Sequence, residues 1–534
     1  MGLSTLMPVS SIALAACSLL LVLYVRSVAR WTARARGRPL PPGPRGLPFV
    51  GNVLDLRKGR PWVAFDQLRD RYGPILYFEA FRQPIVVLGS PDTTLEFLDR
   101  RSANTSDRKQ TPSISLTGHE WALGFLPYGP AWRRQRRILW QHFHPGAVEK
   151  YRPVQLSAVH TFLANVAKDP DRLDDHIQYT FTYAILKIAY GIDVKDENDE
   201  LLAFIDAGLA GTRELVVAAG FLVDFLPFLR HMPSFFPGCG FQNQFAKWRD
   251  DNKLLRDMPF KRFKDAANHK EEPKCILAEV LATADDDSKD SPYDDLEEVA
   301  NDVMSSIFEG AHTEIAFAAG SDTTASVLKT FCLAMSLYPD VQKKAHAELD
   351  DVVGHDRLPD FTDRESLPYL NAIIKESLRW MNVTPLGLAH CTTEDDEFGE
   401  YFIPAGSIVM ANIWACMHDP EIYEDPDIFR PERFIRDGKP DPNVRDPYDF
   451  VFGFGRRICP GRYFGDAALF INVAAMLHVF DITPPIDDNG KEIKIEPQMS
   501  DCVVSRPEDS RCSIKPRGLW AEKLIHSADR ESEL

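Results

Sequence analysis

The sequence lacks the basic excess that binds nucleic acid, since its 534 residues carry a formal net charge of −17. A phosphate backbone requires basic surface, so nucleic acid is excluded as a partner. The nine cysteines show no C-x-x-C spacing, which argues against a disulfide framework or a structural zinc site and fits a reducing compartment. Glycine-serine linkers and internal repeats are also absent after the N-terminal segment. With 44% hydrophobic residues, the chain predicts one large globular unit.

Charged side chains are absent from residues 1–25, and Ile12 to Val25 is almost continuously apolar. At helical rise this run comes close to spanning the hydrocarbon core of a membrane. Six arginines without an acidic residue follow between Arg26 and Arg45, and basic residues that flank a short span stay cytosolic. A secretory signal peptide would carry its positive charge before the apolar run. We therefore expect a retained transmembrane anchor in the endoplasmic reticulum membrane, with a lumenal N-terminus and a cytosolic body.

A proline-rich segment follows the anchor, because residues 40–45 read Leu-Pro-Pro-Gly-Pro-Arg. Its prolines remove backbone donors and fix φ near an extended value, so the segment predicts a stiff spacer. An ordinary linker would look the same, and only the position between an anchor and a globular body gives the segment weight. We expect an anchor at 1–25, a basic and proline-rich linker at 26–48, the main domain at 49–520 and a polar tail at 521–534.

The most specific pattern lies near the C-terminus, where Phe452-x-x-Gly455-x-Arg457-x-Cys459-x-Gly461 places one cysteine in a loop rich in glycine and arginine. A thiolate is a strong ligand of haem iron, and nearby positive charge and backbone donors keep it deprotonated. The glycines let the backbone approach the sulfur and the porphyrin face closely. A lone cysteine would more simply be a buried loop residue. The complete pattern, however, resembles the haem-binding signature of the cytochrome P-450 family, in which Cys459 would be the axial iron ligand.

This resemblance covers the chain from Pro41 to about Pro516 and implies a mainly α (α+β) cytochrome P-450 fold. That fold is a helical triangular prism with a small β-rich region toward the N-terminus, preceded here by the expected transmembrane helix. Haem b would lie between a central helix and a helix over Tyr463–Phe480. Another helix is expected at Pro339–Val353.

The expected central helix carries Ala-Gly-Ser-Asp-Thr-Thr at residues 319–324, after apolar residues spaced by four positions. The segment resembles the family's oxygen-activation segment. In that segment Thr323 would be the hydroxyl at the oxygen, and Asp322 the neighbouring acid that relays protons from water. Without the cysteine pattern, a Gly-Ser kink whose polar residues face solvent would explain the segment equally well. Residues 309–314 depart from the apolar pattern of the family, so the helix register before them stays open.

Three charged residues resemble a structural element of the family. Glu376 and Arg379 lie one helical turn apart, and so on one helix face. Arg433 lies in a segment that matches the family's second arginine segment, so the three would form a buried charge triad. Its role would be to hold the loop that positions Cys459, although Glu-Arg pairs alone decorate many helices.

Four residues match the family's contacts to the haem propionates. These are Trp132 and Arg136 on a Trp-x-x-x-Arg helix, His390 in a later segment, and Arg457 in the cysteine loop. Buried carboxylates demand such donors. The family usually has proline before the histidine, and this chain has Ala389, so a surface-loop histidine is the alternative for His390.

A basic cluster is expected on the proximal face, beside the cysteine loop. On an acidic chain such a cluster suggests an acidic partner, and the resemblance implies the flavin domain of NADPH–cytochrome P-450 reductase. A solvated helix face is the alternative. No glycine-rich dinucleotide fingerprint follows a strand, so the electrons of NADPH should come through that separate protein to a monomeric chain. The cluster consists of Arg133, Arg134, Arg137, Arg456 and Arg462.

The expected function is that of a haem-thiolate monooxygenase, which inserts one atom of O2 into a lipophilic organic substrate. The sequence resembles fungal microsomal enzymes similar to O-methylsterigmatocystin oxidoreductase, which act in secondary metabolism and xenobiotic oxidation. A haem-thiolate isomerase or peroxygenase is one alternative, and a non-catalytic haem-binding protein is another. The Asp322-Thr323 pair and the basic cluster argue against the first. The small residues of the central helix, which would leave the second axial position open, argue against the second. Terpenoids, polyketides, fatty acids and aromatic compounds all remain open as substrates.

Overall fold

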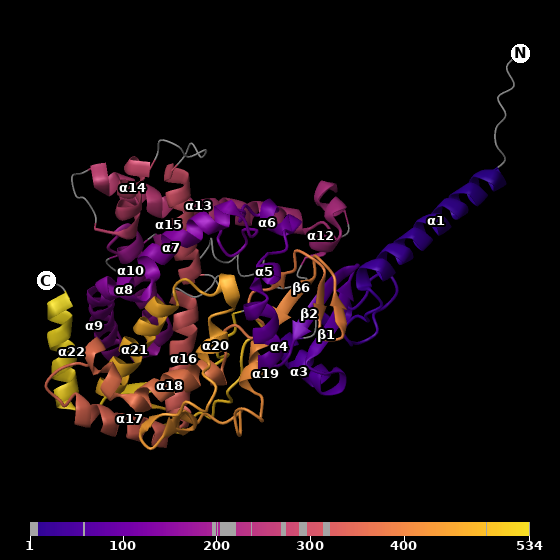
Figure 1. Cartoon of the computed structure of the whole chain (residues 1–534). Coiled ribbons are helices and arrows are strands. Elements are labelled where there is room, and N and C mark those ends of the chain that lie inside the picture. Colours follow the sequence, from indigo (N-terminus) through magenta and orange to yellow (C-terminus); the bar gives the residue numbers. More distant parts are fainter. Residues whose placement is uncertain are drawn as a thin grey trace, which may run out of the picture.

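The computed structural model describes residues 9–56, 59–194, 199, 201–202, 205, 221–236, 238–268, 274–287, 296–312, 321–487, 489–502 and 504–532. Figure 1 shows a helical body with a small sheet near the point where the first helix joins it. The expectation of a helix-rich fold with a small β region is confirmed.

The longer helices give the body its frame. They are α1 (Val9–Ala35), α3 (Pro61–Tyr72), α7 (Pro130–Phe143), α9 (Arg152–Lys168), α10 (Leu173–Tyr190), α13 (Phe241–Asn268), α14 (Ile276–Asp287), α15 (Leu296–His312), α16 (Ser321–Leu337), α17 (Pro339–Val352), α18 (Pro368–Trp380), α21 (Arg462–Val479) and α22 (Leu519–Ser532). Short helices and turns connect them. They are α2 (Val53–Leu56), α4 (Pro91–Thr94), η1 (Leu95–Arg100), α5 (Ser102–Thr105), α6 (Pro112–Leu116), α8 (Pro145–Val148), η2 (Glu149–Tyr151), η3 (Pro170–Arg172), α12 (Leu222–Phe225), η4 (Pro227–His231), η5 (Phe361–Ser366), α19 (Ile413–Met417), η6 (Pro431–Phe434), α20 (Tyr448–Val451) and η7 (Gly455–Arg457).

Proline begins several of the longer helices. Pro61, Pro130, Pro339 and Pro368 are the first residues of α3, α7, α17 and α18. A proline suits this position because its φ is already helical and the N–H that it lacks would have no partner in the first turn. The helices predicted over Pro339–Val353 and Tyr463–Phe480 are confirmed as α17 and α21, each within one residue at either end.

The largest sheet has the strand order β1-β2-β6-β3. β1 (Ile75–Ala80) and β2 (Gln83–Leu88) form an antiparallel hairpin, β6 (Ile408–Ala411) runs parallel to β2, and β3 (His390–Cys391) is antiparallel to β6. Strands from a distant part of the chain thus complete the expected N-terminal β region. The remaining strands pair as β4 (Asp396–Phe398) with β5 (Tyr401–Ile403), β7 (Ile435–Arg436) with β8 (Lys439–Pro440), and β9 (Phe480–Thr483) with β10 (Ser513–Pro516).

The main core surrounds α21. This helix is apolar on nearly every face, and residues such as Phe470, Ile471 and Leu477 are fully buried in it. A helix of that composition must be covered on all sides. Helices α9, α16, α17 and α18 supply the cover, and α16 packs against both α18 and α21. The C-terminal half of the expected central helix therefore lies against the helix that follows Cys459.

The expected central helix is described in two parts, α15 and α16, which pack against each other. Figure 1 shows α16 below α15. Residues 313–320 lie outside the described residues, as do the side chains of residues 308–312, Ser321 and Asp322. The predictions for Ala319, Gly320 and the Asp322 carboxyl group fall on this segment.

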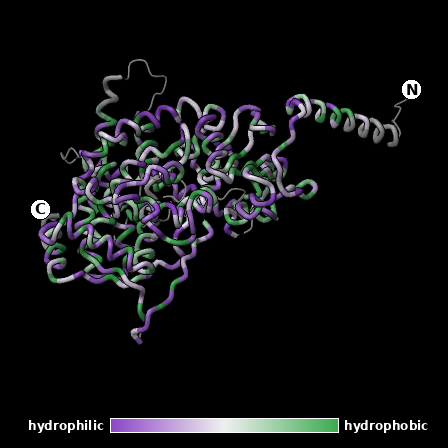
Figure 2. Tube along the Cα trace, turned by 60° about the horizontal axis from the view of Figure 1, so that its bottom comes forward, coloured by the Kyte–Doolittle hydropathy of each residue, from purple (hydrophilic) through white to green (hydrophobic). Residues whose placement is uncertain are grey.

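The N-terminal helix α1 extends to Ala35, so residues 26–35 of the expected linker are helical. Its C-terminal end contacts the body, where Arg34 pairs with Asp395 at 2.5 Å and Arg38 pairs with Glu397 at 2.7 Å. Figure 2 shows α1 projecting from the body and becoming more hydrophilic toward it. Among the residues whose placement is described, no helix combines the length and the apolar run that crossing a membrane requires. Most side chains of the expected anchor, residues 1–25, lie outside that description.

The C-terminal residues do not form the expected polar tail. Leu519–Ser532 is the helix α22, which packs along α9 at the edge of the body (Figure 1). Ala521, Ile525 and Ala528 are buried, and their spacing of four and three residues places them on one helix face. The many charged residues around this stripe obscured it in the sequence.

We predict that Ile525→Ala lowers the free energy of unfolding by about 2–4 kcal/mol, because it removes a fully buried side chain from the contact of α22 with the body. Urea denaturation followed by circular dichroism measures this change. Lys523→Ala, on the exposed face of the same helix, is the control and should leave the midpoint unchanged. Equal midpoints for both variants would mean that α22 does not stabilise the body.

Candidate active site

Cys459 lies in the short loop between η7 and α21, and its side chain is fully buried. Its backbone N–H donates to the carbonyl of Phe452 at 2.8 Å, which folds the loop back on itself. The N–H groups of Gly461 and Arg462, at the start of α21, donate to the Cys459 sulfur. The sulfur therefore faces a helix N-terminus, a position that favours negative charge.

Burial raises the pKa of Cys459 to about 12. The N–H groups of Gly461 and Arg462 and the positive charges of Arg136 and Arg462 act in the opposite direction. The polypeptide alone thus keeps the thiol protonated, whereas a coordinated metal ion deprotonates a thiol outright. These donors and charges would then stabilise the thiolate and limit its basicity, so this donor set fits an axial ligand of haem iron.

Gly455 is required by a close contact of the cysteine loop. Its φ is +54°, and a Cβ atom there would lie 2.5 Å from the Cβ of Ser102 and 2.7 Å from the carbonyl oxygen of Leu98. Any side chain would push the loop away from η1 and α5. Contact with these turns is thus a reason for glycine at this position.

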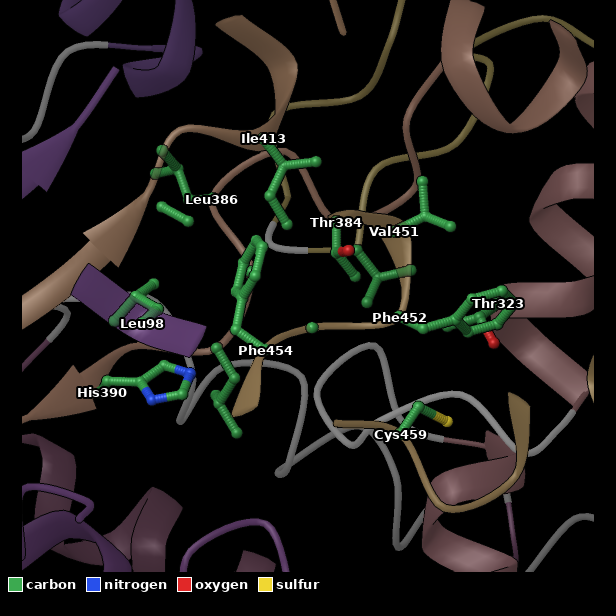
Figure 3. Close-up of a pocket in the computed structure, with 15 residues that line it drawn as sticks. Leu98, Thr323, Thr384, Leu386, His390, Ile413, Val451, Phe452, Phe454 and Cys459 are labelled. Carbon is green, nitrogen blue, oxygen red and sulfur yellow. The ribbon is translucent and has the colours of Figure 1, made fainter. Parts of the chain in front are cut away.

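A small cavity is lined in part by Cys459. Apolar side chains line most of it, among them Leu98, Leu386 and Ile413, and the polar groups are few. In the view of Figure 3, Thr323 and Phe452 lie at the end of the pocket nearest Cys459, and His390 lies at the other end. An apolar pocket with a few polar groups is typical of sites for small lipophilic ligands.

The hydroxyl oxygen of Thr323 is buried and has no hydrogen-bond partner among the described residues. A second small cavity shares Thr323, Thr384 and Phe452 with the first, and Asn382 also lines it. The side-chain oxygen of Asn382 is likewise buried without a partner in the described part of the chain. Buried polar atoms are normally hydrogen bonded, so both oxygens indicate space for bound molecules beside the thiol.

Arg457, in the cysteine loop, and Trp132, on α7, contact each other. The guanidinium of Arg457 lies 4.7 Å from the centre of the Trp132 ring and donates to the carbonyls of Ser106 at 2.7 Å and Leu126 at 2.8 Å. Burial lowers the pKa of Arg457 to about 10, and burial likewise lowers the pKa of Arg136 to about 10. Among the described carboxylates, none forms an ion pair with Arg457. A buried arginine without a carboxylate partner in the described part of the chain fits a site that binds the carboxylates of haem b.

His390 is buried, so it is not the surface-loop histidine that the sequence left open. Its Nδ1 lies 2.7 Å from the carbonyl of Thr105. Burial and the charge of Arg108 hold the pKa of His390 well below its ordinary value. The ring is therefore neutral, and Nδ1 carries its proton because a carbonyl can only accept.

Arg108 was not found by sequence reasoning. It is 4% exposed and donates to the carbonyls of Gly124 at 3.1 Å, Leu388 at 3.1 Å and Ala389 at 2.8 Å. Burial and the charge of Arg457 lower the pKa of Arg108, and burial and the charge of Arg108 lower the pKa of His390. A single arginine in a loop carries no motif, and only the fold brings it to this cation cluster.

The structure brings Glu376, Arg379 and Arg433 together. Arg379 donates to both carboxylate oxygens of Glu376 at 2.8 Å, and Arg433 donates to one of them at 3.1 Å. The side chains of Glu376 and Arg379 are fully buried. Arg379 also donates to the carbonyl of Met417, and Arg433 to that of Glu424, so the triad joins α18 to the segment before η6.

The basic cluster on the expected proximal face is partly assembled around Tyr128. Arg456 donates to the Tyr128 hydroxyl at 2.9 Å, and the guanidinium of Arg133 lies 5.6 Å from the centre of the same ring. Both arginines are exposed. Tyr128 thus joins the basic face of α7 to the cysteine loop at one surface.

The chain was compared with known proteins. A family model described as Cytochrome P-450 matches residues 41–510. The chain is 37% identical to cytochrome P-450 monooxygenase COX2 of Coprinopsis cinerea over 495 residues, and this region covers 92% of each chain. It is 37% identical over 493 residues to cytochrome P-450 monooxygenase ple1 of Rhodocybe pseudopiperita, covering 91% of each. It is also 36% identical over 491 residues to tryptamine 4-monooxygenase of Psilocybe cyanescens, covering 91% of this chain and 94% of that protein.

The chain belongs to the cytochrome P-450 family. It is a haem-thiolate monooxygenase that uses haem b and O2, and members of the family generally work with a reductase and lipophilic substrates. The three relatives are fungal monooxygenases, which confirms the expected fungal group.

We predict that Glu376→Ala lowers the free energy of unfolding by about 3–5 kcal/mol, because it leaves two buried arginines without their carboxylate. Denaturation by guanidinium chloride measures this loss. Asp340→Ala, which breaks an exposed ion pair with Lys343, is the control and should behave as the unaltered protein does. A Glu376→Ala protein of unchanged stability would contradict the structural role of the triad.

Proposed function

We propose that the chain oxidises a lipophilic organic molecule, by hydroxylation or a related reaction, with Cys459 as the axial ligand of the haem iron. The observation that supports this most strongly is the buried sulfur of Cys459 beside an apolar cavity. The hydroxyl of Thr323 lines the same cavity and has no partner among the residues that the structure describes. Trp132, Arg136 and Arg457 would hold the haem propionates. His390 would join them as the doubly protonated ring, because Nδ1 already donates to Thr105 and a carboxylate needs a second N–H at Nε2.

Different residues of the chain would bind the substrate, deliver protons and hold the cysteine loop. When bound, haem b supplies the activation of O2 and the oxidation of a carbon centre. The apolar lining around Leu386 and Ile413 would bind the substrate and exclude water. The Thr323 hydroxyl would hold a proton at the oxygen, and Asp322, the preceding residue, would renew it from water. Phe452 and Gly455 would keep the cysteine loop in place.

The electrons would come from NADPH through NADPH–cytochrome P-450 reductase. The basic cluster supports this proposal because exposed arginines gather beside the cysteine loop on a chain of net charge −17. Such a surface attracts an acidic partner. The same cluster favours a monooxygenase over an isomerase or peroxygenase, since neither of those needs a reductase.

The substrate would belong to fungal secondary metabolism or to xenobiotic oxidation. The relatives support this range, since one of them is named for tryptamine, an aromatic amine. We further propose that residues 1–25 anchor a monomeric chain in the endoplasmic reticulum membrane with its body in the cytosol. The uncharged run before Arg26 and the arginines after it support this location.

We predict that Thr323→Ala diverts electrons from product to peroxide. The enzyme reconstituted with reductase should form several-fold more hydrogen peroxide per NADPH consumed, because oxygen reduced without a positioned proton donor is released. Thr330→Ala is the control, since Thr330 is buried on the same helix without lining the cavity. Equal peroxide yields for the two variants would contradict the role of Thr323.

We predict that Arg133→Glu combined with Arg456→Glu slows reduction by the reductase by about tenfold at low ionic strength, because it reverses two charges of the basic surface. Stopped-flow reduction under carbon monoxide measures the rate. Arg71→Glu combined with Lys523→Glu, at exposed positions of α3 and α22, is the charge-matched control. A rate that falls equally in the control would count against a docking site beside the cysteine loop.

A further inference from the structure

The loop that carries Cys459 is joined across its base. The hydroxyl of Tyr448, at the first residue of α20, donates to the carboxylate of Asp466, in the second turn of α21. The two residues lie 18 positions apart in the sequence, with Cys459 between them. A contact of this kind fixes both ends of the loop at once and removes much of its freedom.

Arg364 completes the contact from outside the loop. Its guanidinium donates to both oxygens of Asp466, at 2.6 and 2.8 Å, and a third donor bonds Asn371 at 3.1 Å. It also lies 5.0 Å from the centre of the Phe470 ring. Arg364 belongs to η5, so Asp466 is bonded to a segment outside the cysteine loop. A two-point pair between arginine and carboxylate gives defined geometry as well as attraction.

Charge and protonation support the same arrangement. Burial and the carboxylate of Asp466 raise the pKa of Tyr448, so its hydroxyl keeps the proton that it donates. Burial tends to lower the pKa of Arg364, but its bonds to Asp466 raise the pKa overall. The side chains of Arg364 and Asp466 are 31% and 21% exposed, which makes them less screened than an ordinary surface pair.

Each end of the loop leads directly to the sulfur. The ring of Tyr448 lies 5.4 Å from that of Phe452, whose carbonyl accepts the N–H of Cys459. On the other side, Asp466 follows Gly461 and Arg462 by about one turn, and these residues donate their N–H groups to the sulfur. Movement at either end would therefore change the bonds that hold Cys459.

We propose that Arg364, Tyr448 and Asp466 form a positioning clamp that sets the place of the Cys459 sulfur relative to the haem iron. The proposal rests on Cys459 being the iron ligand. The clamp is separate from the Glu376, Arg379 and Arg433 triad, whose bonds run to residues 417–430 and not to the loop. None of the three clamp residues lines the cavity beside Cys459.

The test compares Tyr448→Phe and Asp466→Asn with Asp350→Asn. Asp350 makes a two-point pair with Arg517, at 2.9 and 2.6 Å, and serves as a matched control because that pair does not include the cysteine loop. For each purified holoenzyme we would measure haem content, melting temperature and the carbon monoxide difference spectrum of the reduced form. The share of bound haem that gives the red-shifted thiolate band reports on sulfur placement and not on folding.

We expect this share to fall at least twofold in Asp466→Asn and less in Tyr448→Phe, with melting temperatures near that of the control. The double variant should be no worse than Asp466→Asn, because the two groups act through one contact. Arg364→Lys, which keeps the charge but not the two-point geometry, should give an intermediate share. Tyr448→Phe loses only a hydroxyl, so it carries the test if Asp466→Asn does not fold.

A full thiolate share in Tyr448→Phe and in any folded Asp466 variant would overturn the clamp. So would a share that falls only in proportion to melting temperature, as in the control. An unaltered enzyme that itself lacks the red-shifted band would instead overturn Cys459 as the ligand. The two failures are therefore distinguishable.

Discussion

Burial of the Cys459 sulfur opposes its charged form, and the surroundings of the loop act against that effect. Two N–H groups at the start of α21 and the charges of Arg136 and Arg462 favour a thiolate, yet they do not outweigh burial, and the pKa stays near 12. A metal ion bound to the sulfur would lower this pKa enough to deprotonate the thiol. Because a thiolate needs donors at fixed places, the turn at Gly455, the bond from Cys459 to Phe452 and the contact of Tyr448 with Asp466 all constrain one atom.

A second constraint follows from the positive charge beside the cavity. Arg108, Arg136 and Arg457 lie close to one another and to the cavity residues His390 and Cys459, on a chain of net charge −17, and burial lowers the pKa of each. Placing buried cations together costs free energy unless an anion joins them. The carboxylates of haem b would be such anions. The iron of the cofactor would bind the thiolate, and its carboxylates would pair with the arginines. Binding of the cofactor would therefore stabilise the folded state of this region.

Local sequence patterns predicted the elements that depend on local chemistry. The cysteine signature located the loop, and the helical spacing of Glu376 and Arg379 placed both on one face. Contacts between distant segments could not be derived this way. Arg108 has no motif, and the sheet joins residues 83–88 to 408–411 across the chain. Asp466 and Tyr448 each look ordinary alone. The stripe of α22 was readable at helical spacing, but the charged residues around it gave the appearance of a tail.

The central claim is that the Cys459 thiolate binds the haem iron, and the carbon monoxide difference spectrum of the reduced enzyme tests it most directly. The unaltered chain should give the strongly red-shifted band of a thiolate-ligated haem, and Cys459→Ala should lose that band. Haem content and circular dichroism should be compared in both proteins. An unshifted band in the unaltered chain, with full haem content and an intact fold, would contradict the claim.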